Sequence, residues 1–378
     1  MTIIELTFWL SLAFIAYTYA GYPLLMKALA LVRPRPVRKA AITPPLTVII
    51  TAHNEEARLA AKLENTLALD YPPERLQVIV ASDCSTDATD SIARGYAGRG
   101  VELVRSPVRG GKERAQRLAL TRARGDIVVF TDAASRLERG VLRRLAANFA
   151  DESVGCVSSE DRVLPGEGQS GGEGFYVRYE MLLRRLESEV CSLVGLSGSC
   201  FAARKRVCAN FSETLPSDFN TLLECVRRGL RGVSEPAALC YYRPVADERE
   251  FQRKVRTVVR GLTGLAANRD MLNPFRHGLF SLSLASHKLC RWLVPFALAL
   301  SLAANLALAP ASPFYRALLL LQALFYALAW AGMRSRPLAR LLVVKVPFFF
   351  VTVNTSIAVA WLKFLRGERI VAWQPSER

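Results

Sequence analysis

Four apolar segments, one at the start of this 378-residue chain and three near its end, constrain its fold more than any other feature. The first covers residues 6–26 and contains no charged side chain. The other three cover residues 292–308, 317–333 and 346–362. A helix of about 20 apolar residues crosses the core of a bilayer, and shorter helices do so with help from tilt or flanking residues. The sequence therefore predicts one membrane helix before a polar body and about three after it.

A cleaved signal peptide or a large soluble helical core would fit these segments less well. A signal peptide has basic residues before its apolar stretch, but here the only early charge is Glu5 and the basic residues come afterwards. Against a soluble core, turn sequences at residues 309–313 and 334–337 separate the last three segments. The predicted parts of the chain are a first membrane helix within residues 1–32, a polar domain over 44–270, an interfacial segment over 271–291, membrane helices within 292–365 and a tail over 366–378.

The basic residues around the apolar segments predict the orientation of the chain. Cytoplasmic loops of membrane proteins carry an excess of lysine and arginine, and the first segment is followed by Arg33, Arg35, Arg38 and Lys39. We therefore expect the polar body in the cytoplasm. The end of the chain agrees less well, because a third crossing would place Lys363 and Arg366 outside. Whether the last apolar segment crosses the membrane or lies in its interface stays open.

The formal net charge of +17 restricts the partners of the chain. Such a charge is compatible with nucleic acid, anionic lipid or phosphorylated ligands. Because membrane helices are predicted, we expect membrane lipids and phosphate-containing substrates as partners, and no nucleic acid.

The polar body alternates between short apolar runs and helical patterns. Continuous apolar runs, which are typical of strands covered on both faces, occur at residues 46–52, 76–81, 101–104 and 126–131. Helical patterns follow the first run, the second run and the third run, the last of them over residues 113–124. Strands that alternate with helices in this way predict an α/β fold with a mostly parallel sheet. In such sheets ligands bind beyond the carboxyl ends of the strands.

Polar and charged residues follow three of the predicted strands, at Thr51 to Glu56, at Asp83 and at Asp132. Between the last two lies a glycine turn, Arg109-Gly110-Gly111-Lys112, whose backbone amides and lysine are suited to hold phosphate. The dinucleotide motif G-x-G-x-x-G and the Walker motif are both missing from these positions. This disfavours a dinucleotide oxidoreductase and a P-loop ATPase.

Together these motifs resemble those of membrane-bound family 2 glycosyltransferases, in particular bacterial enzymes similar to exopolysaccharide and poly-N-acetylglucosamine synthases. The resemblance covers nearly the whole chain and implies a GT-A domain that uses a nucleotide-sugar donor. It implies that Thr51, His53 and Glu55 line the nucleotide pocket, with His53 where a tyrosine is usual. It also implies that Asp83 accepts hydrogen bonds from the base of the nucleotide.

The same resemblance assigns a metal-binding role to Asp132, which matches the first acid of the Asp-x-Asp motif of the family. That motif holds Mg²⁺ or Mn²⁺ against the diphosphate of the donor. In this chain the second acid is replaced by Ala134. A hard cation can be held by one carboxylate and the phosphates, so we expect weak metal binding without nucleotide. An aspartate that only caps the end of a strand is the simpler alternative.

The catalytic base implied by the resemblance is Asp218. Residues 215–219 match an acidic pair that precedes a helix in the family, with Ser217 in the first place and Asp218 in the second. A base that takes a proton from the acceptor hydroxyl typically accelerates transfer by about 10²- to 10⁴-fold. Aspartate is also a favoured helix cap, and this alternative stays open.

The resemblance also points to three further segments that would contact the acceptor or the donor. Gly198 and Ser199 belong to a segment resembling the glycine-containing loop near the acceptor, where missing side chains let a sugar approach the backbone. Arg256 remains from the Gln-x-x-Arg-Trp pattern of processive relatives, whereas the glutamine and tryptophan do not. Its guanidinium suits a diphosphate, or it belongs to a basic helix at the membrane surface. The helix with Glu180 and Glu187 either lies on the acceptor side of the predicted site or is a surface helix with ordinary ion pairs.

The sequence therefore predicts an integral protein of the bacterial inner membrane whose cytoplasmic GT-A domain transfers a sugar with inversion. A UDP-sugar is the favoured donor and a lipid-linked or polysaccharide acceptor is expected. Two alternatives stay open: a processive polysaccharide synthase, and a catalytically silent partner in envelope assembly, which would act together with other envelope polysaccharide assembly proteins. We expect His277 and His287 to be interfacial residues rather than ligands.

Overall fold

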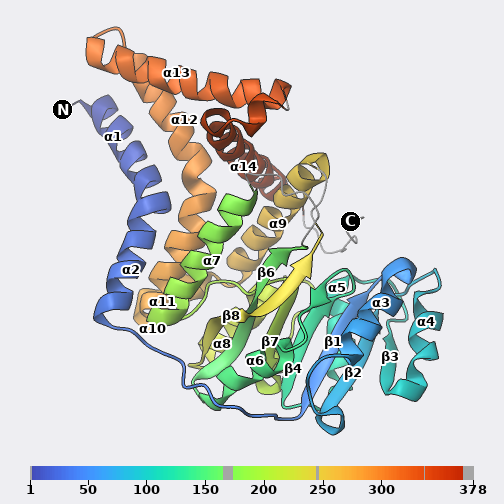
Figure 1. The fold of residues 1–378 in the computed structure, drawn as a ribbon. Coiled ribbons are helices and arrows are strands. Elements are labelled where there is room, and N and C mark those ends of the chain that lie inside the picture. Colours follow the sequence, from blue (N-terminus) through green and yellow to red (C-terminus); the bar gives the residue numbers. More distant parts are fainter. Residues whose placement is uncertain (1, 165–172, 244–246, 336, 369–378) are drawn as a thin grey trace.

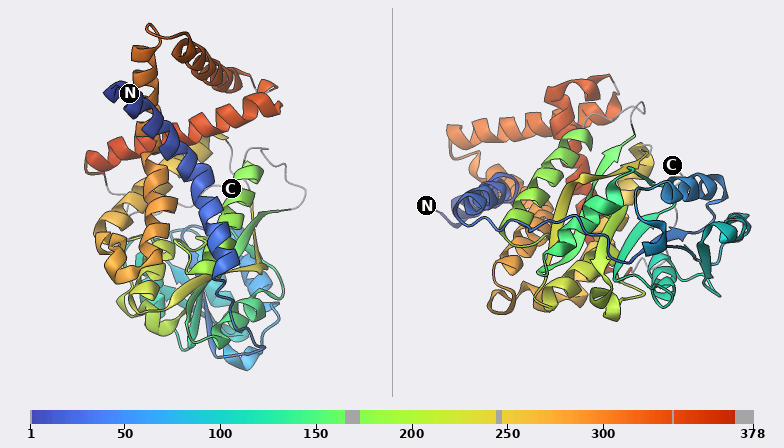
Figure 2. Two further views of the ribbon diagram at one scale, coloured as in Figure 1. Left: turned by 90° about the vertical axis from the view of Figure 1, so that its left-hand side faces the viewer. Right: turned by 60° about the horizontal axis from the view of Figure 1, so that its bottom comes forward.

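The computed structural model describes residues 2–164, 173–243, 247–335 and 337–368. An α/β unit with a single sheet lies at one end of the molecule, and long helices from both ends of the chain lie at the other (Figure 1). The views in Figure 2 show the same division from two further directions.

The sheet has eight strands in the order β3-β2-β1-β4-β7-β6-β8-β5. Strands β3, β2, β1 and β4 are parallel to one another, as the sequence predicts. Strand β7 is antiparallel to β4 and β6, while β8 pairs in parallel with β6, so the sheet is mixed. The strands are β1 (Leu46–Ala52), β2 (Leu76–Ser82), β3 (Val101–Arg105), β4 (Ile127–Asp132), β5 (Arg136–Leu137), β6 (Val154–Val163), β7 (Cys200–Arg204) and β8 (Arg231–Tyr242).

The register of the parallel strands brings the predicted polar residues to one edge of the sheet. Thr51 at the end of β1 lies opposite Asp132 at the end of β4. On the other side of β1, Ala52 lies opposite Ser82, the last residue of β2. The segments that follow all three strands therefore begin next to one another.

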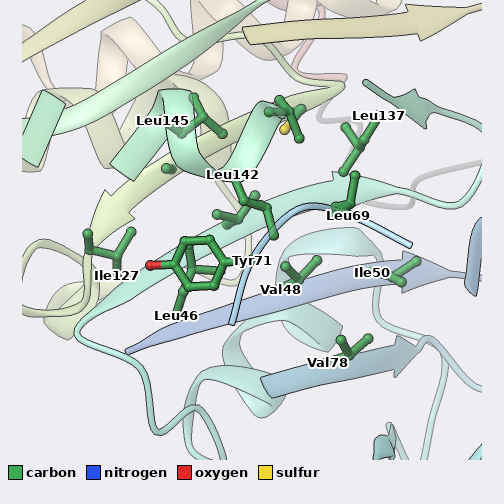
Figure 3. Packing of buried hydrophobic residues seen from close by; sticks show 14 of the residues in the cluster. Leu46, Val48, Ile50, Leu69, Tyr71, Val78, Ile127, Leu137, Leu142 and Leu145 are labelled. Carbon is green, nitrogen blue, oxygen red and sulfur yellow. The ribbon is translucent and has the colours of Figure 1, made fainter. Parts of the chain in front are cut away.

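Apolar side chains on both faces of the sheet form its core, which explains why β1 is apolar at successive positions. Val48 and Ile50 pack against helix residues such as Leu142 on one face (Figure 3). Ile49 packs with Phe130 on the other face. Burial of each such side chain stabilises the fold by about 1.5–3 kcal/mol. The helices of the α/β unit are α3 (Glu56–Leu67), α4 (Thr89–Gly95), α5 (Lys112–Leu120), α6 (Val141–Ala147), α7 (Glu173–Val190), α8 (Ser217–Arg227) and α9 (Asp247–Ala267).

Four helices in the described part of the chain are long and apolar enough to cross a membrane, which matches the predicted number. The first and last of them lie near the two ends of the chain, and α1 packs against α12. Helix α13 lies across the ends of α1 and α12, and α14 packs against α9 (Figures 1 and 2). The candidate spans are α1–α2 (Ile3–Val32), α11–α12 (Leu279–Leu308), α13 (Pro313–Arg334) and α14 (Leu342–Leu365).

The second candidate span starts earlier than the sequence predicts. It begins at Leu279, directly after the short helix α10 (Pro274–His277), whereas the sequence predicts a start at Trp292 after an interfacial segment. Six polar side chains interrupt the apolar run in between: those of Ser281, Ser283, Ser286, His287, Lys288 and Arg291. All of them except Lys288 are buried inside the protein, so the helix needs no apolar residues at these positions.

Two candidate spans contain a π-helical turn, and these two turns lie side by side. Residues Tyr17–Gly21 join α1 (Ile3–Ala16) to α2 (Tyr22–Val32), and residues Ala285–Cys290 join α11 (Leu279–Leu284) to α12 (Arg291–Leu308). The two turns touch, and the Tyr17 hydroxyl lies 2.7 Å from the Ser286 hydroxyl oxygen. Such turns are rare and frequently occur at functional sites.

One hydrophobic cluster joins the α/β unit to the long helices. It contains Phe219 and Leu223 of α8, Leu262 of α9, Trp292 of α12 and Ile357 of α14. The α/β unit and the candidate spans are therefore packed through shared buried side chains and not only connected by the chain.

Candidate active site

A cavity of about 530 Å³ lies at the carboxyl edge of the sheet and extends to the candidate membrane spans. Its walls come from the sheet edge, from α7, α8 and α9, and from α12 and α14. Six of the residues predicted from the sequence line it: Lys112, Asp132, Gly198, Ser199, Asp218 and Arg256.

An ion pair between Asp132 and Lys112 lies in this cavity. The Lys112 ammonium nitrogen is 2.5 Å from Asp132 Oδ1 and also donates to the carbonyl oxygen of Gly198 at 3.0 Å. Lys112 is the first residue of α5, and Asp132 is the last residue of β4. The pair therefore joins the predicted donor residues to the acceptor-side loop.

The glycine turn before Lys112 is held in place by Asp83. The backbone N–H groups of Gly110 and Gly111 donate to the two carboxylate oxygens of Asp83, each at 2.8 Å. Gly111 has a φ of +93°, a left-handed conformation that glycine adopts without strain. Each oxygen of Asp83 keeps a further lone pair, so the predicted contact with a nucleotide base stays a prediction.

The other predicted nucleotide-pocket residues lie beside Asp83 but do not line the cavity. Thr51 is buried and its hydroxyl accepts a hydrogen bond from Gln116. His53 Nδ1 is 2.7 Å from the carbonyl oxygen of Asp83. Burial raises the pKa of the Glu55 carboxyl, and the Arg58 guanidinium at 2.9 Å opposes this shift. Their place in a nucleotide pocket stays a prediction.

The turns that carry these residues have unusual backbone conformations. Asn54 and Cys84, which follow β1 and β2, have φ angles of +53° and +54°. The two turns hold each other, because Asn54 Oδ1 accepts from the Thr86 N–H at 2.9 Å. Non-glycine residues with positive φ are uncommon and cluster at functional sites.

Asp218 lies in the first turn of α8, where the partial positive charge of the helix end favours a carboxylate. A Cβ atom at Gly198 would stand 3.4 Å from Asp218 Oδ2. The missing side chain at Gly198 thus leaves room next to the predicted base. The structure brings the predicted base and the predicted acceptor loop together.

Glu113 is a residue of the cavity that the sequence does not reveal. It is 2 % exposed, forms an ion pair with Arg260 of α9, and accepts from the Ser217 N–H at 3.4 Å. It therefore joins α5, the start of α8 and α9. The sequence gives no signal for this role, because its partners are distant in the chain.

Lys62 is a second functional candidate that the sequence does not reveal. It is 3 % exposed and lies beneath the segment that carries Asp132. Its ammonium donates to the hydroxyl of Thr131 at 3.0 Å and to the carbonyl oxygen and hydroxyl of Ser135 at 2.8 and 3.1 Å. The Thr131 hydroxyl also donates to the carbonyl oxygen of Ser199. A buried cation thus fixes the loop between the donor and acceptor residues, and burial lowers its pKa.

The side of the cavity toward the long helices contains a buried ionic network. His287 lies 2.6 Å from Glu187 and 3.0 Å from Glu180, and Arg291 donates to Glu180 at 2.8 Å. Burial opposes ionisation of Glu180, but His287 and Arg291 hold the pKa of this carboxyl well below its usual value. The expectation of an interfacial His287 is therefore wrong, and the alternative of ordinary surface ion pairs on α7 does not hold for Glu187, because these side chains face each other inside the protein.

Arg256 lies among other cations in the cavity. Burial lowers the pKa of its guanidinium, and the neighbouring Arg260 and Arg253 lower it further. Like charges held together in a partly buried place favour an anionic ligand such as a diphosphate. This supports the predicted diphosphate contact of Arg256.

A metal ion at this site would depend on Asp132 and the ligand. Among the described residues there is no group of three histidine, cysteine or acidic side chains that could hold a metal. Asp132 does hold a cation of the protein itself, the Lys112 ammonium. The site therefore fits a hard cation that takes one ligand from the protein, the Asp132 carboxylate, and its other ligands from the phosphate oxygens of the donor.

Comparisons with known proteins agree with this arrangement. Residues 47–209 match the family described as glycosyl transferase family 2. The structure resembles that of the mannosyltransferase PcManGT from Pyrobaculum calidifontis in complex with GDP-Man and Mn²⁺, with a TM-score of 0.75 and 25% sequence identity. The match covers 97% of this chain and 100% of that chain, so it includes the long helices.

Curated relatives match a smaller part of the chain. A beta-monoglucosyldiacylglycerol synthase of Synechocystis sp. is 27% identical over 168 residues, which cover 41% of this chain and 35% of that protein. A dolichyl-phosphate beta-glucosyltransferase of Drosophila melanogaster is 33% identical over 129 residues, which cover 29% of this chain and 39% of that protein. The chain thus spans well under half the length of these relatives. Residues 47–209 therefore form a glycosyl transferase family 2 domain, in a chain that has a GT-A fold and, within its described part, four long apolar helices.

Proposed function

We propose that this enzyme transfers a sugar, with inversion, from a nucleoside-diphosphate sugar to an acceptor hydroxyl presented from the membrane. The observation that carries the proposal is a single cavity that contains the Asp132–Lys112 pair and Asp218 and reaches the candidate spans. We further propose that the enzyme resides in the bacterial inner membrane with its α/β unit in the cytoplasm, as the basic residues after the first span favour.

The donor would bind with its diphosphate between the loop of Lys112 and helix α9. Lys112 and Arg256 supply positive charge there, and the amino end of α5, which begins at Lys112, also favours an anion. Asp132 would hold Mg²⁺ or Mn²⁺, which neutralises charge on the diphosphate when bound. The PcManGT structure contains GDP-Man and Mn²⁺, which supports a donor of this class; a UDP-sugar remains favoured by the sequence and a GDP-sugar is the alternative.

In the proposed reaction the acceptor hydroxyl oxygen attacks the anomeric carbon of the donor sugar. A new carbon–oxygen bond forms as the bond between the anomeric carbon and the diphosphate oxygen breaks. Asp218 takes the hydroxyl proton, and the nucleoside diphosphate leaves with the bonding electrons. Lys112 and Arg256 stabilise the developing negative charge of the leaving group, because preorganised cations act most strongly in a site shielded from water.

The lining of the cavity favours an acceptor that is anchored in the membrane. The same cavity is lined by Asp132 and Asp218 and by apolar side chains of the candidate spans, Trp292 of α12 and Phe349 and Ile357 of α14. A lipid-linked sugar or a glycan emerging from the membrane can contact both kinds of residue. A free sugar would leave the apolar wall uncovered.

Two observations bear on the alternatives. Thr257 stands where processive relatives carry tryptophan, which favours single transfers over a processive synthase. A catalytically silent partner is favoured by Ala134 and Ser217, which replace acids of the family pattern. Against silence, the structure keeps Asp132, Lys112 and Asp218 in one cavity.

Titration calorimetry on the full chain in detergent, with UDP and then GDP, each with and without Mn²⁺, tests the proposal. We expect one nucleotide to bind, and to bind at least about tenfold more tightly with Mn²⁺, because the diphosphate and Asp132 share the ion. Binding of neither nucleotide would contradict a working donor site and favour the silent partner.

A further inference from the structure

A second cavity, of about 1050 Å³, lies where the long helices meet the α/β unit, away from the catalytic cavity. Its walls include the end of α2, the end of α7, the start of α11 and the first residue of β8 (Figure 1). The first candidate span ends at Val32 and the second begins at Leu279, and both residues line this cavity. It therefore lies at the level where two spans leave the apolar part of a membrane.

The charged residues that line this cavity are all basic. Among its described lining residues there are four arginines, one histidine and no carboxylate: Arg33, Arg35, Arg231, Arg276 and His277. A partly enclosed space with several cations and no acid attracts an anion strongly, because the low-dielectric walls focus the field.

Arg231 has a structural role, which leaves the other arginines for a ligand. It is 3 % exposed and donates to the carbonyl oxygens of Arg35 and Pro36 and to Asp151. Burial lowers the pKa of its guanidinium and the nearby Arg35 lowers it further. Arg231 thereby fixes the segment after α2, which carries Arg33 and Arg35. Within the described residues, the side chains of Arg33, Arg35 and Arg276 make no hydrogen bond or ion pair with the protein.

Apolar groups surround these cations both inside and outside the cavity. Leu29, Val226 and Phe280 contribute to its walls. Val32, which also lines it, is 77 % exposed, and outside it Phe275, next to Arg276, is 98 % exposed. Exposed large apolar side chains beside a basic cavity, at the end of two spans, match the boundary between acyl chains and headgroups.

We propose that this cavity binds the phosphate headgroup of an anionic membrane phospholipid, with the acyl chains lying along α2 and α11. Basic pockets between membrane helices on the cytoplasmic side are suited to anionic headgroups. A soluble phosphate would meet the cations but leave Val32 and Phe275 in water. The lipid would fasten the start of the α/β unit to the membrane surface, separately from donor and acceptor binding.

Lipid binding to the full chain in detergent tests this proposal without any donor or acceptor. Native mass spectrometry would compare phosphatidylglycerol with phosphatidylcholine of the same acyl chains. We expect the wild type to retain about tenfold more phosphatidylglycerol, and R33Q/R276Q to lose this preference, because each basic residue near a membrane surface contributes about fivefold in affinity for anionic lipid. The matched control R94Q/R122Q removes the same charge from exposed positions on the far side of the α/β unit and should keep the preference.

Two further measurements separate this proposal from its alternatives. Equal thermal unfolding of R33Q/R276Q and wild type without added lipid would show that the variant is folded. Inorganic phosphate at millimolar concentration should not remove bound phosphatidylglycerol. Retained preference in R33Q/R276Q would overturn the proposal, and so would loss of the preference in K288Q alone, because Lys288 lines the catalytic cavity.

Discussion

The Lys112 ammonium nitrogen lies 2.5 Å from Oδ1 of Asp132, so the carboxylate that matches the metal-binding motif of the family is engaged by a cation of the protein itself. A divalent ion at Asp132 competes with this lysine. The diphosphate of a donor removes the competition, because it offers Lys112 a new anionic partner and supplies oxygen ligands to the ion. Metal binding and donor binding are therefore expected to depend on each other.

Replacing Ala134 with aspartate should restore the second acid of the motif. We expect A134D to bind Mn²⁺ without nucleotide at least about tenfold more tightly than wild type, since affinity for hard cations rises with the number of carboxylate ligands. Calorimetric titration with Mn²⁺ measures this. The control A97D adds the same charge at an exposed position beyond α4, and it should leave the titration unchanged. Identical titrations of A134D and wild type would contradict a metal position next to residue 134.

Removing the Asp132 carboxylate should uncouple nucleotide binding from metal. In D132A the nucleotide should bind equally with and without Mn²⁺, because no side chain then holds the ion beside the diphosphate. Titration of the nucleotide at several Mn²⁺ concentrations checks this. A metal dependence like that of wild type would show that the ion is held elsewhere.

Replacing the proposed base should stop transfer but not donor binding. We expect D218N to lose about 10²- to 10⁴-fold in transfer rate, with nucleotide affinity within about twofold of wild type. Sugar transfer to membrane extracts and nucleotide titration measure the two quantities. D126N, at the opposite end of β4, is the matched control and should keep full activity. Equal loss of binding and transfer in D218N would indicate a structural role for Asp218.

The buried ion pair between Glu113 and Arg260 should matter for stability. E113Q leaves a guanidinium without its carboxylate in the cavity, and breaking such a pair costs about 3 kcal/mol in the free energy of unfolding. The double variant E113Q/R260M should recover most of this loss, because it leaves no unpaired charge. Thermal and denaturant unfolding in detergent compare the variants. Additive losses in the double variant would contradict a direct pair.

The buried Lys62 ammonium should make the free energy of unfolding depend on pH in the alkaline range. Burial lowers its pKa, so between this lowered value and the pKa of an exposed lysine the folded chain binds fewer protons than the unfolded chain. Stability therefore rises with pH through this window. We expect the melting temperature of K62M to lack this rise as the pH increases toward about 10, where an exposed lysine titrates. The exposed control K205M should follow wild type. The same pH slope in K62M and wild type would contradict the prediction.

Much of the fold could be predicted because its central strands are continuous apolar runs. Strands β1, β2 and β4 are buried along nearly their whole length, and this leaves a direct signal in the sequence. Strands β6 and β8 include polar or charged residues such as Glu160 and Glu235, which have partners within the protein, so no such run marks them. The start of the second candidate span was predicted too late for the same reason, because buried polar side chains such as His287 interrupt its apolar run.

The residues of the candidate site could be predicted where they belong to short sequence motifs. They could not be predicted where their role depends on contacts in the folded chain. Asp132, Lys112 and Asp218 belong to motifs and come together in one cavity. Glu113 and Lys62 lie on the inner faces of ordinary amphipathic helices, and nothing in their neighbours along the chain marks them. Their importance follows from the burial of a charge, which only the folded structure shows.

The hydrophobic cluster that joins α8 and α9 to α12 and α14 has a consequence for how such enzymes diversify. Phe219 follows the proposed base directly, and it packs in the same cluster as Trp292 and Ile357 of the long helices. A change in the membrane helices therefore reaches the catalytic turn through touching side chains. Under the proposed function, we expect that swapping the long helices alone does not exchange acceptor preference between such proteins, and that a chimera needs α8 and α9 together with the candidate spans against which they pack.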